Sequence, residues 1–325
     1  ADLGWACGYT VDVCGNVVDC AAEGLECGAN EACVGGIDGP TVCTASADTS
    51  CQLCGAVPEC DGGAQLTRLT GRVISPGRDD ANTANQVGVP NAIVYILKTD
   101  QIADLPAIPS GIPSGGLSCD RCEDQDLGPL LAGAITDASG NFSIEGNVPV
   151  GVEFLLVVKA GKFRRVEAIE LPAEAACQTT ALPTTLPGNP ARLPRDLSDG
   201  LAVNIPKIAI STGRIDAMEC VFSKMGLATG EFGNFGSAAS VHLYRGGLTG
   251  SPEGARIDGD TPDDGTLYGS LARMQSYDML VSDCEGGAWD GEAAFAQRDE
   301  NGSKVREYVN RGGRLFASHL SMSWL

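Results

Sequence analysis

The sequence predicts a multidomain chain: a small disulfide-rich module, then an antiparallel β-sandwich, then an α/β domain with a parallel sheet. Three observations predict this order. Nine of the 14 cysteines lie in the first 60 residues. Strand-sized runs rich in β-branched residues follow one another over residues 65–176, and strands alternate with helical stripes over residues 207–325. Between these segments, residues 177–206 contain five prolines and are predicted to form an extended, stiff linker.

The first module, residues 1–64, is acidic throughout. It contains ten carboxylic side chains and no lysine or arginine, so it carries half of the formal net charge of −20. Nucleic-acid binding depends on basic side chains that neutralise phosphates, so this charge excludes it, and an anionic membrane surface is disfavoured for the same reason. No apolar run approaches the roughly 20 residues that a membrane-spanning helix needs. We therefore expect no transmembrane segment.

This module also has few large apolar residues, and chains of about 60 residues or fewer usually need covalent or metal links to fold. Regular cysteine spacing in such a module indicates disulfides, which predicts a location outside the cell or on its outer surface. One group of six is expected to pair among themselves: Cys7, Cys14, Cys20, Cys27, Cys33 and Cys43. The same is expected of a second group, with at least one bridge between the module and the later segments: Cys51, Cys54, Cys60, Cys119, Cys122 and Cys177.

Zinc is the alternative for part of the second group. Cys51-Gln-Leu-Cys54 and Cys119-Asp-Arg-Cys122 are paired Cys-x-x-Cys elements, which have the spacing of structural zinc ligands. The chain has two histidines, and the first of them, His242, is far in sequence from the cysteine-rich module, so no histidine is at hand as a further zinc ligand. Disulfides are therefore the preferred interpretation.

The second segment, residues 65–176, reads as short strands without helical periodicity, which predicts an antiparallel sandwich. Four motifs follow one another along it: Gly71-Arg-Val73, Val89-Pro-Asn-Ala92, Thr136-Asp-Ala-Ser-Gly140-Asn-Phe142 and Pro149-Val-Gly151. In this order they resemble the carboxypeptidase regulatory-like, transthyretin-like sandwich family. The resemblance implies a structural or ligand-presenting module without catalytic residues of its own. The long insertion 98–131 departs from the family's pattern.

The third segment, residues 207–325, alternates between strands and helices, which predicts a parallel sheet with right-handed crossovers. Strands are expected at 207–211, 241–244, 278–282 and 314–318, and the helices between them carry apolar stripes such as Met218, Val221, Phe222 and Met225. A doubly wound sheet usually has five or more strands. The domain is therefore expected to be incomplete or to be covered by neighbouring chains, which favours assembly.

Two stretches of this segment carry a second resemblance. Residues 277–286, Tyr-Asp-Met-Leu-Val-Ser-Asp-Cys-Glu-Gly, and residues 308–319, Tyr-Val-Asn-Arg-Gly-Gly-Arg-Leu-Phe-Ala-Ser-His, resemble the type-1 glutamine-amidotransferase-like superfamily, including its ThuA-like branch. This implies a flavodoxin-like parallel sheet. In that superfamily the nucleophilic cysteine follows the strand after which this chain has Ser318 and His319. The resemblance therefore implies that the family's nucleophile is absent.

Ligands of open α/β sheets bind beyond the carboxyl ends of the strands. Here these ends supply a thiol, an imidazole and a carboxylate in Cys284, His319 and Glu285, which are the ingredients of nucleophilic catalysis. Other side chains at the same ends are Ser211, Thr212, Asp216, Asp283 and Ser318. The competing prediction is a disulfide between Cys220 and Cys284, the two cysteines of this domain, which would consume the thiol. We expect that bridge, and with it no catalytic residue.

Acidic clusters are the candidates for a metal ion. Asp258, Asp260, Asp263 and Asp264 stand before Gly265, and Glu123, Asp124 and Asp126 form a second cluster. Carboxylates suit Ca²⁺, but neither cluster has the spaced pattern of a calcium loop. A solvated loop is the main interpretation, calcium is the alternative, and no other cofactor is expected.

Three functional hypotheses follow. The first is a non-catalytic extracellular or cell-surface protein with a structural or adhesive role, acting in an assembly with protein partners or copies of itself. The second is an extracellular hydrolase or amidotransferase-like enzyme that uses the α/β domain. The third is a binding module for carbohydrate or calcium. The state of the Cys284 thiol separates the first two, because a bridged cysteine cannot act as a nucleophile.

Overall fold

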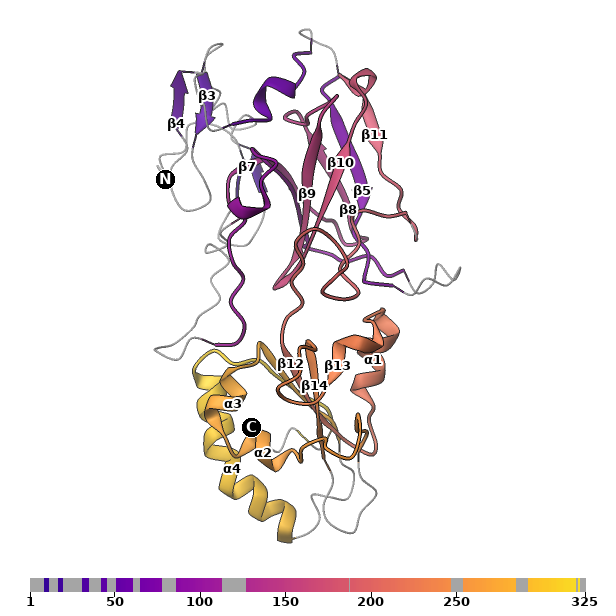
Figure 1. Ribbon diagram of the computed structural model, residues 1–325. Helices are drawn as coiled ribbons and strands as arrows, with labels where there is room; N and C mark the ends of the chain where they lie inside the picture. Colours follow the sequence, from indigo (N-terminus) through magenta and orange to yellow (C-terminus); the bar gives the residue numbers. More distant parts are fainter. Residues whose placement is uncertain are drawn as a thin grey trace. The chain divides into compact units, whose positions relative to one another are not determined.

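A computed structural model of the chain has a mixed α/β fold with antiparallel sheets, a parallel sheet and two disulfides (Figure 1). It describes residues 9–11, 17–19, 31–34, 42–45, 51–60, 65–77, 86–112, 127–186, 188–246, 254–284, 292–319 and 321, with the backbone alone for the first four ranges and for residues 292–299. The chain divides into two compact units. The β unit comprises residues 1–107, 121–194 and 198–204, and the α/β unit comprises residues 108–120, 195–197 and 205–325.

The cysteine-rich segment contains two antiparallel strand pairs. Strand β1 (Tyr9–Val11) pairs with β2 (Val17–Asp19), and β3 (Glu31–Val34) pairs with β4 (Val42–Ala45). The register of the second pair places the backbone of Cys33 opposite that of Cys43. The sulfur atoms of all six cysteines from Cys7 to Cys43 lie outside the described residues, as do Cys119 and Cys122. The pairing expected for them stays a prediction.

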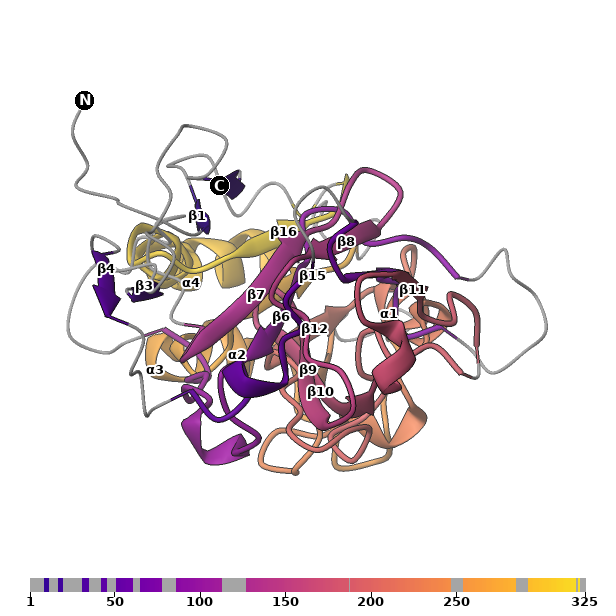
Figure 2. The ribbon, with the colours of Figure 1, turned by 90° about the horizontal axis from the view of Figure 1, so that it is seen from above.

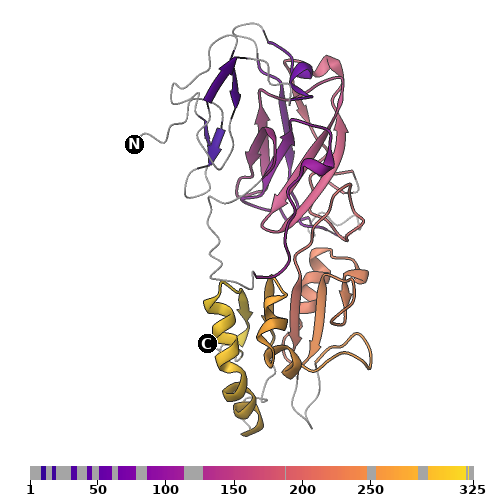
Figure 3. The ribbon, with the colours of Figure 1, turned by 60° about the vertical axis from the view of Figure 1, so that its left-hand side comes forward.

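Two further sheets make up the rest of the β unit (Figure 3). The larger has the order β10-β9-β6-β7 and is antiparallel throughout: β6 (Ile93–Leu97), β7 (Leu130–Ile135), β9 (Glu153–Ala160) and β10 (Phe163–Glu170). The smaller has the order β11-β5-β8: β5 (Arg68–Arg72), β8 (Asn141–Glu145) and β11 (Thr179–Ala181). Three short 3₁₀ turns accompany them: η1 (Cys54–Ala56), η3 (Ile102–Asp104) and η4 (Ala173–Ala175).

One apolar core lies between these two sheets. Leu69 and Ile144 from the smaller sheet and Val94, Phe154 and Leu156 from the larger sheet are fully buried in the same cluster. The other face of the larger sheet has a second buried cluster: Tyr95, Leu97, Leu127, Leu155, Val157 and Val166. Strands buried on both faces have continuous rather than alternating apolar sequences, which is what the sequence shows for β6 and β9.

The turn between β7 and β8 explains the Thr-Asp-x-x-Gly-x-Phe motif. The Asp137 carboxylate accepts hydrogen bonds from the backbone N–H groups of Ser139 and Asn141, each at 2.8 Å. The pKa of Asp137 is lowered, first by its side-chain hydrogen bond from Asn141. Gly140 has a φ of +83°, and a Cβ there would lie 2.4 Å from the Val73 carbonyl oxygen. The motif thus serves the fold of the turn.

Residues 177–206, which the prolines predict to be a linker, pack largely on the β unit. Strand β11 pairs with β5 in a parallel register, so the smaller sheet is mixed and not purely antiparallel. Ala191 and Leu193 are buried in the core between the sheets. Proline disfavours a helix, but it does not prevent an extended segment from pairing with a strand at its edge or from burying side chains. The contacts of this segment continue to Asn204, the last residue assigned to the β unit.

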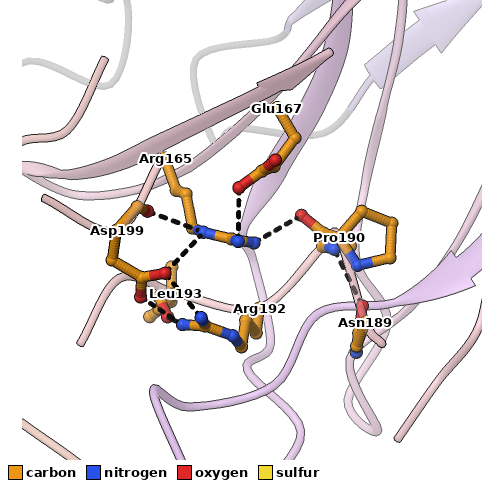
Figure 4. A network of polar contacts seen from close by, with 8 residues as sticks. Arg165, Glu167, Asn189, Pro190, Arg192, Leu193 and Asp199 are labelled. Atoms are coloured by element: carbon orange, nitrogen blue, oxygen red, sulfur yellow. Dashed lines mark hydrogen bonds and ion pairs between the residues drawn. The ribbon is translucent and has the colours of Figure 1, made fainter. Parts of the chain in front are cut away.

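Arg165 on β10 binds this segment at two points, Asp199 and Pro190 (Figure 4). Its side chain is 8% exposed and forms an ion pair with Glu167. Its Nε donates to the backbone carbonyl of Asp199 at 2.8 Å, and its Nη1 donates to that of Pro190 at 2.9 Å. Arg192 pairs with the Asp199 carboxylate through both of its terminal nitrogens. A buried charge network therefore joins β10 to both ends of residues 190–199.

Two disulfides lie in the described part of the β unit. Cys60 is bonded to Cys177 and Cys51 to Cys54, so all four partners belong to the second group of cysteines named above. The Cys60–Cys177 bond joins the end of the cysteine-rich segment to the residues that precede β11. The Cys51–Cys54 bond contradicts the zinc alternative, because sulfurs bonded to each other are not available as zinc ligands.

The α/β unit contains a five-stranded, fully parallel sheet in the order β13-β14-β12-β15-β16. Its strands are β12 (Ile208–Thr212), β13 (Phe232–Gly233), β14 (Val241–Arg245), β15 (Met279–Ser282) and β16 (Leu315–Ala317). Four of them match the predicted strands, and the two-residue β13 is additional. Its helices are α1 (Met218–Met225), α2 (Gly265–Tyr268), α3 (Leu271–Gln275) and α4 (Glu292–Asn310), with a 3₁₀ turn η5 (Thr229–Glu231).

Helices α2, α3 and α4 lie on one side of the sheet and α1 on the other (Figures 1 and 2). Tyr268, Met274 and Tyr308 from the three helices form one core with Ala209 and Leu280 from the sheet. Side chains at even positions of β15 therefore face α2–α4, and those at odd positions face α1. Among the described residues no helix has the length and apolar character needed to cross a membrane.

Part of the insertion 98–131 belongs to the α/β unit. The backbone N–H of Gly111 donates to Asp278 Oδ1 at 2.8 Å, and the N–H of Lys207 donates to Asp278 Oδ2 at 2.7 Å. Asp278 is 5% exposed, so its carboxylate is satisfied internally. The N–H of Ile112 also donates to the Gln275 carbonyl at 2.8 Å. Residues 108–112, which lie between β6 and β7 in the sequence, are thus part of the α/β unit and not of the β unit.

Candidate functional site

Two candidate residues meet at the carboxyl end of the parallel sheet. The Sγ of Cys284 lies 3.1 Å from Nδ1 of His319. The two residues come from the ends of neighbouring strands, two positions beyond the paired Ser282 and Ala317. The register of β15 and β16 places the two residues near each other, and the turn after β16 brings the imidazole to the thiol. Cys284 is fully buried and His319 is exposed.

Ser318 supports this pair from the other face of the sheet. Its Oγ donates to Asp216 Oδ2 at 2.6 Å and accepts a hydrogen bond from the Cys284 backbone N–H at 3.0 Å. The chain from Asp216 through Ser318 to Cys284 therefore fixes the ends of β15 and β16 relative to each other.

The backbone at the site is tightly constrained. His319 has a φ of +46°, a left-handed conformation that costs a non-glycine residue roughly 1–2 kcal/mol. At the end of β12, a Cβ on Gly213 would lie 2.3 Å from the carbonyl oxygen of Cys284. Only glycine lets the end of β12 approach Cys284 this closely. The strained turn after β16 thus carries His319.

Asp283 lies beside the pair on the α1 side of the sheet. It is fully buried, and its Oδ2 accepts a hydrogen bond from the Met218 backbone N–H at 3.2 Å. Burial raises its pKa to about 7; the neighbouring carboxylates of Glu219 and Asp216 act in the same direction, and backbone donors act against them. Its Oδ1 has no hydrogen-bond partner within the described part of the chain. At neutral pH the Asp283 carboxyl is therefore partly protonated and partly ionised.

The raised pKa of Asp283 predicts that the α/β unit loses stability as the pH rises. Between about pH 4, the ordinary pKa of an aspartate, and about pH 7, the folded protein holds a proton that the unfolded chain has released. The free energy of unfolding should fall through this window by on the order of 2–4 kcal/mol and level off above it. Urea unfolding followed by circular dichroism from pH 4.5 to 8 measures this. Asp283→Asn should flatten the profile and Asp260→Asn, an exposed control, should not; equal slopes in all three proteins would contradict the prediction.

The predicted bridge between Cys220 and Cys284 is not formed. Cys220 lies on the exposed surface of α1, whereas Cys284 is buried at the end of β15 and contacts His319. By the alternation of β15, Cys284 follows the positions that face α2–α4, whereas Cys220 lies on α1 at the other side of the sheet, and a disulfide needs the two Cβ atoms to face each other. Cys284 is therefore present as a thiol and not as a disulfide with Cys220. Glu285, the third catalytic candidate, lies outside the described residues.

The predicted calcium candidates do not converge on one point. Asp258 Oδ1 accepts from the Asn234 side chain and from the Asp260 N–H, each at 2.9 Å. Asp263 forms an ion pair with Arg245, and Asp264 accepts a 3.4 Å hydrogen bond from Ser211. Across the described ranges, no group of three or more His, Cys, Asp or Glu side chains is placed to hold a metal. Donors of the protein itself occupy the carboxylates of Asp258, Asp263 and Asp264. Glu123, Asp124 and Asp126 lie outside the described residues.

Sequence reasoning missed a buried polar cluster next to β14. His242 Nδ1 and the Tyr277 hydroxyl are 2.8 Å apart, and the hydroxyls of Tyr277 and Tyr244 are also 2.8 Å apart. Burial raises the pKa of both tyrosines, that of Tyr244 to about 12, and lowers the pKa of His242, which is therefore neutral at pH 7. Histidine and tyrosine at alternate positions of a strand gave no signal of this contact. The cluster belongs to the core beneath α3 and adds nothing to the thiol site.

The candidate site thus consists of Cys284 and His319, held by Ser318 and Asp216 and flanked by the buried carboxyl of Asp283. Neither the models of known protein families nor the curated proteins with which the chain was compared match it, so the interpretation of this site rests on its own geometry.

Proposed function

We propose that the chain is an extracellular modular protein whose α/β unit catalyses thiol-dependent hydrolysis or acyl transfer on a carboxamide or ester. The observation that carries this proposal is the 3.1 Å contact between the Cys284 sulfur and the His319 ring nitrogen at the carboxyl end of a parallel sheet. A nucleophile within hydrogen-bond reach of a base is the signature of covalent catalysis. The two disulfides and the density of cysteines support the extracellular location.

The proposed reaction needs two roles. His319 accepts the thiol proton of Cys284, and the resulting thiolate attacks the substrate's carbonyl carbon. Collapse of the tetrahedral intermediate expels the amine or alcohol, which takes the proton back from the imidazolium, and leaves a thioester on Cys284. Water or an acceptor amine then attacks the thioester and regenerates the thiol. Ser318 and Asp216 act as positioning residues, because their hydrogen bonds run to each other and to the Cys284 backbone and hold the ends of the two strands.

The relationship to known superfamilies is part of the same proposal. The five-stranded parallel sheet supports assigning the α/β unit to the glutamine-amidotransferase-like superfamily, and the two facing sheets support a carboxypeptidase regulatory-like sandwich for the β unit. Relative to the amidotransferase pattern, base and nucleophile would have exchanged places: the strained turn after β16 carries His319, and the neighbouring strand carries the cysteine.

Cys284 is fully buried, so the test must first establish that small reagents and substrates reach its thiol. We expect the native protein to hydrolyse p-nitrophenyl acetate or the p-nitroanilide of glutamine, and iodoacetamide to inactivate it by modifying Cys284. Cys284→Ala should abolish turnover, and His319→Ala should reduce it by about 10²–10⁴-fold, the usual contribution of a general base. Cys220→Ala, which removes the exposed thiol of α1, is the matched control and should leave turnover unchanged. Turnover that survives Cys284→Ala would remove Cys284 from the mechanism.

A structural or adhesive role within an assembly is the second candidate. Two sets of cross-links within the β unit favour it. The Cys60–Cys177 bond and the Arg165 network both hold residues 177–199, which are not part of the larger sheet. Such cross-linking suits a protein that withstands an extracellular environment. Sedimentation of the full chain over a hundredfold concentration range should reveal self-association. A monomer throughout, together with thiol-dependent turnover, would favour the enzyme over the assembly.

A further inference from the structure

The Cys51–Cys54 disulfide differs in kind from the Cys60–Cys177 disulfide. Three positions separate the first pair of cysteines and 117 separate the second. A disulfide stabilises a fold mainly by restricting the unfolded chain, and this effect grows with the length of the loop that it closes. Opening the short loop therefore releases little chain entropy. The Cys51–Cys54 bond contributes the smaller part of the covalent stabilisation of the β unit.

The turn that carries this bond is held by other contacts. Leu53, between the two cysteines, is 6% exposed in the core between the sheets, and its N–H donates to the Lys98 carbonyl at 3.1 Å. The neighbouring Gln52 accepts a 3.0 Å hydrogen bond from the Thr99 hydroxyl through its Oε1. None of these contacts depends on the sulfur–sulfur bond. The turn should keep its shape when the bond is open, with both thiols side by side.

The two cysteines differ in exposure to solvent. Cys54 is exposed at the start of η1, whereas Cys51 is half-buried. Thiol–disulfide exchange proceeds by attack of a thiolate on one sulfur, so the accessible sulfur is the one attacked. An incoming thiolate therefore meets Cys54, and Cys51 is the leaving group. A bond that is exposed on one side, closes a short loop and lies on a separately anchored turn can open and close without unfolding the protein.

We propose that Cys51 and Cys54 form a thiol–disulfide exchange site that oxidises dithiols, an activity separate from the thiol chemistry of Cys284. One thiolate of the dithiol attacks Sγ of Cys54, the Cys51–Cys54 bond breaks, and Cys51 departs as a thiolate that takes up a proton. The second thiolate of the dithiol then attacks the first sulfur of the dithiol, which is bonded to Cys54 in the mixed disulfide, and releases Cys54 as a thiolate that takes up a proton. The dithiol loses two electrons and two protons to become a disulfide, and Cys51 and Cys54 gain both. A small disulfide such as oxidised glutathione reverses these steps and restores the bond.

Graded reduction of the full-length protein tests the first requirement. The native chain is equilibrated with increasing dithiothreitol, alkylated and mapped by mass spectrometry. We expect Cys51 and Cys54 to be half-reduced at a dithiothreitol concentration at least tenfold below that for Cys60 and Cys177, with an unchanged circular dichroism spectrum at that point. If both pairs open together, or if opening Cys51–Cys54 alone unfolds the β unit, the proposal is wrong.

Trapping and turnover test the exchange itself. With oxidised glutathione as the probe, Cys51→Ser should form a mixed disulfide on the exposed Cys54 at least tenfold faster than Cys54→Ser forms one on the half-buried Cys51. The wild-type protein should oxidise a fluorescent dithiol peptide in a one-to-one ratio, and the double variant Cys51→Ser/Cys54→Ser should not. Cys284→Ala should exchange as the wild type does, so a failure of the proposed hydrolase leaves this result readable. Equal rates for the two single variants, or peptide oxidation by the double variant, would refute the site.

Discussion

Replacing Arg165 with alanine is expected to destabilise the β unit by about 3–5 kcal/mol, because removing one partner from a buried ionic network leaves the others unpaired. The Arg165 side chain is 8% exposed, and its guanidinium contacts Glu167 as well as the backbone carbonyls of Asp199 and Pro190. The burial that lowers the pKa of Arg165 is also what makes its loss costly, since water cannot easily replace its hydrogen bonds. Urea unfolding of the oxidised protein measures the change.

Two variants calibrate this value. Arg165→Lys keeps the charge but loses the planar fork of donors, so it should recover only part of the lost stability. Arg311→Ala removes an exposed ion pair with Glu307 and should change the free energy of unfolding by about 0.5 kcal/mol or less. If Arg165→Ala behaves like Arg311→Ala, the network of Figure 4 does not hold residues 190–199 in place.

The second large effect concerns the Cys60–Cys177 bond. The double variant Cys60→Ala/Cys177→Ala should lose about 5 kcal/mol of stability according to the chain-entropy relation for a separation of 117 residues. The same relation gives about 2 kcal/mol for Cys51→Ala/Cys54→Ala, whose separation is 3. Thermal unfolding of the three proteins side by side tests both values. A smaller loss for the long loop than for the short one would show that the unfolded chain is not what the Cys60–Cys177 bond restricts.

Local patterns in the sequence predicted most of the regular elements. The apolar runs at β6 and β9 match observed strands, because those strands are buried on both faces. The stripe on α1 also matches an observed helix, although Val221 and Met225 of that stripe are exposed. The two-residue β13 escaped prediction because it is too short to have a period. The parallel pairing of β11 with β5 escaped it for a different reason: it joins residues more than 100 positions apart, and a proline-rich composition does not indicate where an extended segment finds its partner.

The sequence alone identified the residues of the thiol site but could not predict that they are in contact. Cys284 and His319 were both candidates, but their contact depends on β15 and β16 being neighbours and on Ser282 standing opposite Ala317. Strand order and register are properties of the whole sheet, and no short motif encodes them. The predicted Cys220–Cys284 bridge rested on counting cysteines, and counting does not reveal that Cys220 lies on the exposed surface of α1.

The hydrogen bond between Gly111 and Asp278 has a consequence for the order of folding during synthesis. These residues are 167 positions apart. Ribosomes add roughly 5–20 residues per second, so Asp278 is synthesised on the order of 10–30 seconds after Gly111. The strands on either side of the 98–131 insertion can pair in that interval, since β6, β7 and the β9 strand that also pairs with β6 all precede Asp278 in the chain. All residues of the β unit, up to Asn204, are therefore synthesised before Asp278, and Gly111 can make its contact in the α/β unit only after Asp278 has been added.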